Sequence, residues 1–142
     1  MFVLTYFKDI YNRIYFSYIY SFYAEGSYEE GIKEFNYYND LIKIQFELNI
    51  NANQKSYLDI FKIWGDSYFK LNQFNDASKI YLNIIPHYKD NGLIRFNLGV
   101  CFVNLNEKQK ACEHFKLSYS FFQNKNDTRK CSIIQSILNS LN

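Results

Sequence analysis

The chain has 142 residues, the length of one ordinary domain, and its hydrophobic content of 48% is too high for a disordered protein. With 5 glycines and 1 proline it is too poor in turn-forming residues for an all-β domain, which favours an all-α fold. The formal charge of +2 is far below the positive excess that phosphate binding usually needs, which disfavours nucleic-acid binding as the main role. Phe, Tyr, Ile, Asn and Lys dominate the composition, as expected for a gene from an AT-rich genome.

The first 26 residues are strongly aromatic, but polar residues recur in them every three or four positions. This spacing predicts an amphipathic helix with a wide apolar face. The charged residues among its first thirteen positions argue against a transmembrane segment and against a secretory signal. The alternative interpretation is a helix that contacts a membrane interface. The polar residues are Thr5, Lys8, Asp9, Asn12, Arg13, Ser17 and Ser21.

Two stretches of the chain repeat with an offset of 34 residues. The first has Trp64, Gly65, Tyr68, Leu71, Ala77 and Tyr81, and the second has Leu98, Gly99, Phe102, Leu105, Ala111 and Phe115. A weaker third copy lies 46 residues before the first, with Tyr18, Phe22, Tyr28, Gly31 and Phe35. A period of this length predicts helix pairs that stack on one another.

Capping signals predict where several helices begin and end. Ser27–Glu30 and Asn106–Gln109 have the form of capping boxes, which predicts that the second helix of a pair begins at each. Pro86 predicts the end or a kink of a helix that begins near Phe74. Asp127 and Thr128 predict the start of a final helix that covers the end of the stack. Its expected apolar face is Ile133, Ile134, Ile137, Leu138 and Leu141.

Residues that carry catalysis or bind metals are few. His87 and His114 are the only histidines, and neither lies in a metalloprotease or triad-like motif. Cys101, Cys112 and Cys131 form no CxxC pair, which predicts free thiols in a reducing compartment and no zinc site. We interpret Cys112 as a core thiol and His114 as a surface imidazole. We therefore expect no enzymatic activity, no cofactor and no metal.

The repeats resemble the tetratricopeptide repeat (TPR), whose units are antiparallel helix pairs of the same length with small residues at the eighth and twentieth positions. Gly65 with Ala77 and Gly99 with Ala111 occupy those positions in two units. The resemblance implies that large residues fill the space between successive pairs, namely Tyr68, Tyr81, Phe102 and Phe115. It implies one domain over residues 1–142, a short TPR-like α-solenoid. Its units cover about residues 12–48, 58–91 and 92–125, with a loop at 49–53 and a capping helix at about 127–141.

In that family the first helix of each unit lines a concave groove that receives an extended peptide or a partner helix. The resemblance, carried over by position, implies a partner-binding groove of Arg13, Phe16, Ser17, Tyr20, Tyr23, Lys62, Ile63, Asp66, Phe69, Lys70, Phe96, Asn97, Val100 and Asn104. The carboxylate clamp of chaperone-binding members is absent. Its positions hold Phe16, Tyr20, Leu93 and Phe96 here.

Two functions are compatible with these residues. The first is a non-enzymatic protein–protein interaction scaffold, a structural or adaptor subunit of a larger assembly. The second is a small cytosolic chaperone that holds an extended client segment, because the short chain also resembles the type III secretion chaperones of bacteria. Both imply protein partners inside a cell, in the cytoplasm or on the matrix side of a mitochondrion.

Overall fold

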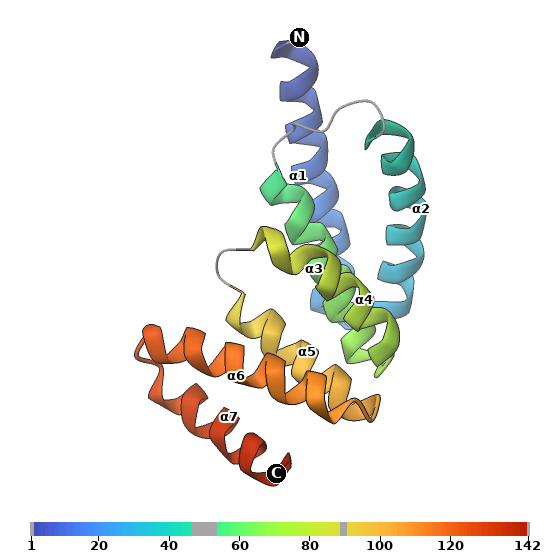
Figure 1. Ribbon diagram of the computed structural model, residues 1–142. Coiled ribbons are helices and arrows are strands. Elements are labelled where there is room, and N and C mark those ends of the chain that lie inside the picture. Colours follow the sequence, from blue (N-terminus) through green and yellow to red (C-terminus); the bar gives the residue numbers. More distant parts are fainter. Residues whose placement is uncertain (1, 47–53, 89–90, 142) are drawn as a thin grey trace. The chain divides into compact units, whose positions relative to one another are not determined.

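The computed structural model describes residues 2–46, 54–88 and 91–141, with side chains at 10–11, 13–39 and from 58 onward. Helices hold 88% of the described residues and no strand occurs among them, which confirms the all-α prediction. The predicted loop at 49–53 lies outside the described ranges. The helices are α1 (Phe2–Glu25), α2 (Tyr28–Phe46), α3 (Gln54–Lys70), α4 (Phe74–Ile84), α5 (Gly92–Asn104), α6 (Lys108–Asn124) and α7 (Thr128–Leu141), with a short 3-10 helix η1 (Ile85–His87) after α4 (Figure 1).

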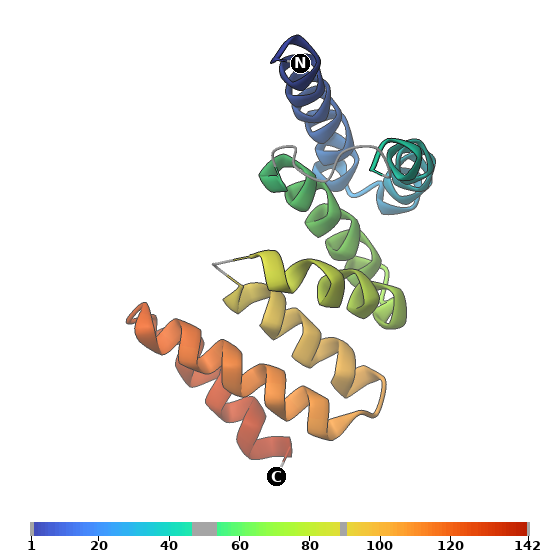
Figure 2. The ribbon, with the colours of Figure 1, turned by 45° about the horizontal axis from the view of Figure 1, so that its top comes forward.

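The chain divides into two compact units, Met1–Asn72 and Gln73–Asn142. In the first unit α1 packs against both α2 and α3, and α2 also contacts α3. In the second unit each helix packs against the next one along the chain, from α4 to α7. Figure 2 shows α6 between α5 and α7 in this unit. Within the units, short connections join α1 to α2, α5 to α6 and α6 to α7, and the two helices of each of these pairs pack against each other.

Residues in the left-handed backbone region mark the turns after α1, α3, α5 and α6. They are Gly26 at φ 80°, Asn72 at 58°, Asn106 at 60° and Asn126 at 57°. Asn72 lies 46 residues after Gly26, and Asn106 lies 34 residues after Asn72, which are the two offsets of the sequence repeat. After Asn106 the N–H of Glu107 donates to the carbonyl of Phe102 at 2.8 Å, as in a Schellman turn. Equivalent turns therefore follow the spacing of the repeat.

The predicted helix boundaries are confirmed at three places and wrong at one. α2 begins directly after Ser27, α4 ends at Ile84 before Pro86, and α7 begins directly after Asp127. Asn106 is not an N-cap, because α6 begins at Lys108 after Glu107. Asn106 instead ends α5 in the left-handed conformation, which Asn adopts more readily than most residues.

The core of the first unit consists mainly of aromatic and isoleucine side chains. Ile19, Phe35, Tyr38, Ile60 and Ile63 are buried together, with Tyr15, Phe16, Tyr23, Phe61 and Trp64 packed against them. The Trp64 ring stacks on Phe35 at a centroid distance of 4.1 Å, which joins α3 to α2. The Tyr15 ring stacks on Tyr38 at 3.7 Å, and its hydroxyl donates to the Glu34 carbonyl at 2.7 Å. These contacts fix the orientation of α1 within its unit.

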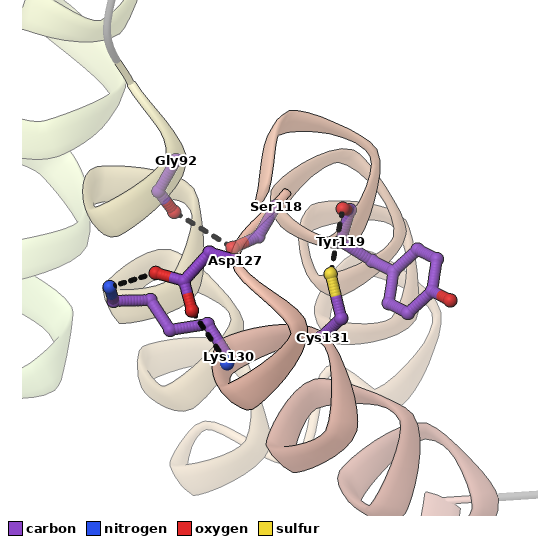
Figure 3. Close-up of polar contacts among 6 residues, drawn as sticks. All are labelled: Gly92, Ser118, Tyr119, Asp127, Lys130 and Cys131. Atoms are coloured by element: carbon purple, nitrogen blue, oxygen red, sulfur yellow. Dashed lines mark hydrogen bonds and ion pairs between the residues drawn. The ribbon is translucent and has the colours of Figure 1, made fainter. Parts of the chain in front are cut away.

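The second unit is built around a close approach of α5 and α6. Ala111 is fully buried, and Ser118 Oγ donates to the Gly92 carbonyl at 2.8 Å (Figure 3). Phe115, for which the resemblance implies a place between successive pairs, packs on Gly99 within its own pair. On α7, Ile134 and Leu138 are buried, but Ile133 is 48% exposed. The prediction that Ile133 belongs to the apolar face of α7 is therefore wrong, because Ile133 lies on the solvent side of the helix.

Candidate partner-binding surfaces

The predicted groove residues of the first unit lie on α1 and α3, two helices in contact with each other. Arg13, Ser17, Tyr20 and Lys70 are exposed, while Phe16, Tyr23, Lys62, Asp66 and Phe69 are half-buried. Ile63 is only 7% exposed and belongs to the core cluster. The described surface of this unit therefore takes aromatic and charged side chains from both helices, without Ile63.

A row of aromatic rings runs along α1 to the start of α2. The rings of Phe16 and Tyr20 are nearly parallel at a centroid distance of 6.0 Å, and Tyr20 and Tyr23 follow at 6.3 Å. Tyr23 is in turn 5.5 Å from Tyr28. Because Tyr20 is exposed, the row presents an aromatic side chain to any partner that approaches this surface.

An ion pair lies on α3 beside this row. Lys62 Nζ is 2.5 Å from Asp66 Oδ2, and the Asp66 side chain is mostly buried. Burial raises the pKa of Tyr23 above its usual value, and the negative charge of Asp66 raises it further. Tyr23 is therefore a neutral phenol near neutral pH, and its O–H remains a hydrogen-bond donor.

The predicted groove residues of the second unit all lie on α5. Phe96, Asn97 and Val100 are half-buried and Asn104 is exposed. Asn97 Nδ2 donates to Tyr81 Oη of α4 at 3.2 Å, which fixes one side of α5. The Phe96 ring meets Phe115 edge to face at 5.6 Å. Contacts with α4 and α6 thus position the half-buried residues of this surface.

Two further apolar residues on α5 are exposed beside the predicted groove positions. Leu93 is 54% exposed and Val103 is 38% exposed. Together with Phe96 and Val100 they are spaced three, four and three residues apart, so that all four lie along one side of α5. We call these four residues the α5 stripe. The apolar spacing is visible in the sequence, where Leu93 occupies a position of the absent carboxylate clamp.

The opposite side of α5 is apolar as well. Ile94, Leu98 and Cys101 are buried there. Arg95 is the only charged residue of the helix. A surface helix normally has one apolar side, which faces the core, so a second apolar side with Leu93 and Val103 exposed is unusual for a free surface.

His114 does not lie where the sequence placed it. Its ring stacks on Phe102 at 5.4 Å, and its Nδ1 atom is buried without a hydrogen-bond partner among the described residues. Burial lowers the pKa of His114, and the positive charge of Arg95 lowers it further. The prediction of a surface imidazole is therefore wrong.

The prediction for Cys112 is wrong as well, because Cys112 is half-buried and not a core thiol. The buried thiol is Cys101, and burial raises its pKa to about 12.

A hollow of about 500 Å³ lies between α6 and α7. Most of its lining side chains are amides or hydroxyls, and Cys131 Sγ lies 3.8 Å from the Tyr119 carbonyl at its edge (Figure 3).

Within the described ranges no three His, Cys, Asp or Glu residues are grouped so that they could hold a metal ion. None of the described helices is long and apolar enough to cross a membrane.

No protein-family model matches the sequence, and no curated protein matches it. Among solved structures, the chain is similar to the one described as PcrH in complex with the chaperone binding region of PopD. The TM-score is 0.69 at 13% identity, and the match covers 94% of this chain and 92% of that chain. At this identity the similarity concerns the fold. The chain thus has an all-α architecture of stacked helix pairs that is shared with a protein of known structure.

Proposed function

We propose that the chain is a non-enzymatic TPR-like module that binds an extended segment of a partner protein along the first helices of its pairs. The observation that carries this proposal is the α5 stripe, on which Leu93 and Val103 are exposed although the opposite side of α5 already forms the buried apolar face. A partner that covers the stripe would remove apolar surface from water, at about 25 cal/mol for each Å² buried.

The first unit offers a second candidate surface of its own. Tyr20 and the half-buried Phe16 offer aromatic surface, and Lys62 with Asp66 offers a charge pair beside it. A few large anchors usually dominate such interfaces, and charges at the rim add selectivity. The similarity to PcrH, whose structure contains the chaperone binding region of PopD, supports the assignment of a segment-binding role.

A chaperone that binds and releases a client is the form of this function that we favour. A permanent subunit of a larger assembly is the second candidate, and exposed apolar residues on both units favour it, such as Ile14 and Leu93. Either form belongs in a reducing intracellular compartment, the cytoplasm or the mitochondrial matrix side. The free thiols of Cys101, Cys112 and Cys131 are compatible with such a compartment.

A display library of random linear peptides, selected on the purified full chain, tests the proposal. We expect enrichment of peptides with apolar anchors, and loss of their binding in the double variant Leu93→Asp and Val103→Asp. The matched control is Leu117→Asp, an exposed apolar residue on α6 that lies outside the stripe. Selection of no peptide, or equal binding by the double variant, contradicts the proposal.

The size of the chain expressed alone separates the two forms of the function. A soluble monomer or dimer that binds the selected peptides supports the chaperone. A chain that is insoluble without a partner supports the permanent subunit.

A further inference from the structure

α1 carries a second apolar surface on a side different from that of Phe16 and Tyr20. Ile10, Ile14 and Tyr18 follow one another at intervals of four residues, and all three are exposed, Ile14 by 65%. We call these three residues the α1 row. At 100° per residue Ile14 lies on the side of α1 opposite to the buried Ile19. The α1 row therefore faces away from the core of its unit.

The two serine hydroxyls beside the α1 row already have hydrogen-bond partners. Ser17 Oγ donates to the Arg13 carbonyl at 3.1 Å, and Ser21 Oγ donates to the Tyr18 carbonyl at 2.7 Å. Covering these hydroxyls would leave no unpaired donor, which is the usual cost of burying polar groups. The surface is thus suited to close packing against another element.

α7 has the opposite character on its exposed side. Ile133 is the exposed large apolar residue there, and its exposed neighbours are polar: Thr128, Arg129, Ser132, Gln135, Ser136, Asn139 and Ser140. That composition is typical of a helix that ends a stack in water. The α1 row instead has the apolar composition of a helix side that packs against another helix.

We propose that the α1 row is a docking surface for an amphipathic helix of a partner protein, with an acidic residue opposite Arg13. Side chains four residues apart form a ridge on a helix, and such a ridge fits into the groove between two ridges of another helix.

The charge of Arg13 favours a different partner over a second copy of the chain. Arg13 is exposed and directly precedes Ile14, the middle residue of the α1 row. A twofold axis at Ile14 would bring two Arg13 side chains close together, and their like charges would repel each other. An acidic residue on a partner helix would pair with Arg13 instead. A membrane surface is disfavoured because Glu29 and Glu30 are exposed in the first turn of α2, in the same unit.

Two synthetic amphipathic helical peptides, presented to the full chain, test this docking surface. They have identical leucine faces and differ only in the residue that flanks this face, which is Glu in one and Lys in the other. We expect the Glu peptide to bind two- to fivefold more tightly than the Lys peptide, because one exposed ion pair changes the affinity by about this factor. Arg13→Glu should reverse that preference. Ile14→Ser should weaken binding of the Glu peptide about tenfold.

Leu93→Ser in the α5 stripe is the matched control, and it should leave helix binding unchanged. If the display library yields no peptide but the helical Glu peptide still binds, the proposed function is contradicted and the α1 docking surface is not. Circular dichroism shows whether Ile14→Ser remains folded. The proposed docking surface is contradicted if neither peptide binds at about 1 mM, or if Ile14→Ser binds the Glu peptide as tightly as the wild type. It is also contradicted if the wild-type chain is a dimer that Ile14→Ser dissociates, because the occupant is then a second copy. Binding to anionic phosphatidylserine vesicles that Ile14→Ser abolishes would contradict it as well, because the occupant is then a membrane.

Discussion

Phe115 of α6 lies directly over Gly99 of α5, so close that a Cβ atom at Gly99 would be 2.7 Å from the ring. We predict that Gly99→Ala lowers the free energy of unfolding by about 1 to 3 kcal/mol through overpacking. This cost exceeds the roughly 0.5 to 1 kcal/mol by which Ala is favoured over Gly within a helix. Chemical denaturation of both proteins measures the difference.

The control for this contact is the same substitution in a chain that also carries Phe115→Leu. Removal of the ring should make room for the added methyl group, so that Gly99→Ala costs less in that background. If Gly99→Ala lowers the free energy of unfolding equally in both backgrounds, the contact between Gly99 and Phe115 is not the cause of the loss.

Ser118 offers a second test of the same helix pair. Its buried hydroxyl donates to the Gly92 carbonyl, 26 residues earlier in the chain. Ser118→Ala should lower the free energy of unfolding by about 1 kcal/mol, the usual net value of one hydrogen bond. Ser120→Ala, on the exposed side of α6, should have almost no effect. Equal effects of the two substitutions would contradict the assigned hydrogen bond.

The sequence was most informative where local chemistry allows a single outcome. Pro86 lacks the N–H that an α-helix needs, and α4 ends at Ile84, with Pro86 in the short 3-10 helix η1 that follows. The offsets of 34 and 46 residues reappear in the turn residues Gly26, Asn72 and Asn106. Asn106 itself was misassigned because Asn suits both an N-cap and a left-handed turn, and only the backbone decides between them.

The surfaces were harder to predict because burial depends on which helices meet. Ile63 has the position of a groove residue in the repeat, yet it is buried with Ile19 and Phe35. Leu93 and Val103 look like core residues in the sequence and are exposed. Aromatic and aliphatic residues are so frequent in this chain that hydrophobicity alone does not separate core from surface.

The hydrogen bonds of Asp127 predict how α7 responds to acid. Its Oδ1 accepts the N–H of Lys130 at 3.1 Å, and its Oδ2 pairs with the Lys130 ammonium group (Figure 3). The hydrogen bond from the Lys130 side chain lowers the pKa of Asp127, and that from its backbone lowers it further. Its contribution to stability is therefore present above the usual carboxyl pKa of about 4 and lost as pH falls through the lower pKa of the folded state.

Hydrogen exchange of the first turn of α7 across this acidic range measures the effect. We expect faster exchange as Asp127 becomes protonated, and already fast exchange at neutral pH in Asp127→Ala. The N-terminal turn of α5 has no acidic residue and is the internal reference in the same samples. Unchanged exchange in Asp127→Ala would show that this cap does not hold the helix.

His114 predicts a second pH dependence, at a higher pH. Burial and the charge of Arg95 lower its pKa, although Glu113 acts in the opposite direction. The unfolded chain therefore takes up a proton near pH 6.5 while the folded chain does not. Stability should fall as pH decreases from about 6.5 through the lower pKa of the folded state. His114→Phe should remove this dependence, whereas replacement of the exposed His87 by Gln should leave it.

We expect partner segments to bind to aromatic and apolar surface rather than to a titrating or reactive residue. The affinity of a library-selected peptide for two double variants of the full chain tests it most directly. Tyr20→Ala with Phe69→Ala should weaken binding by roughly tenfold or more, because large aromatic anchors commonly dominate interface energies. His87→Ala with Cys112→Ser should leave the affinity unchanged. Normal binding by the aromatic pair together with loss of binding in the second pair would contradict the claim.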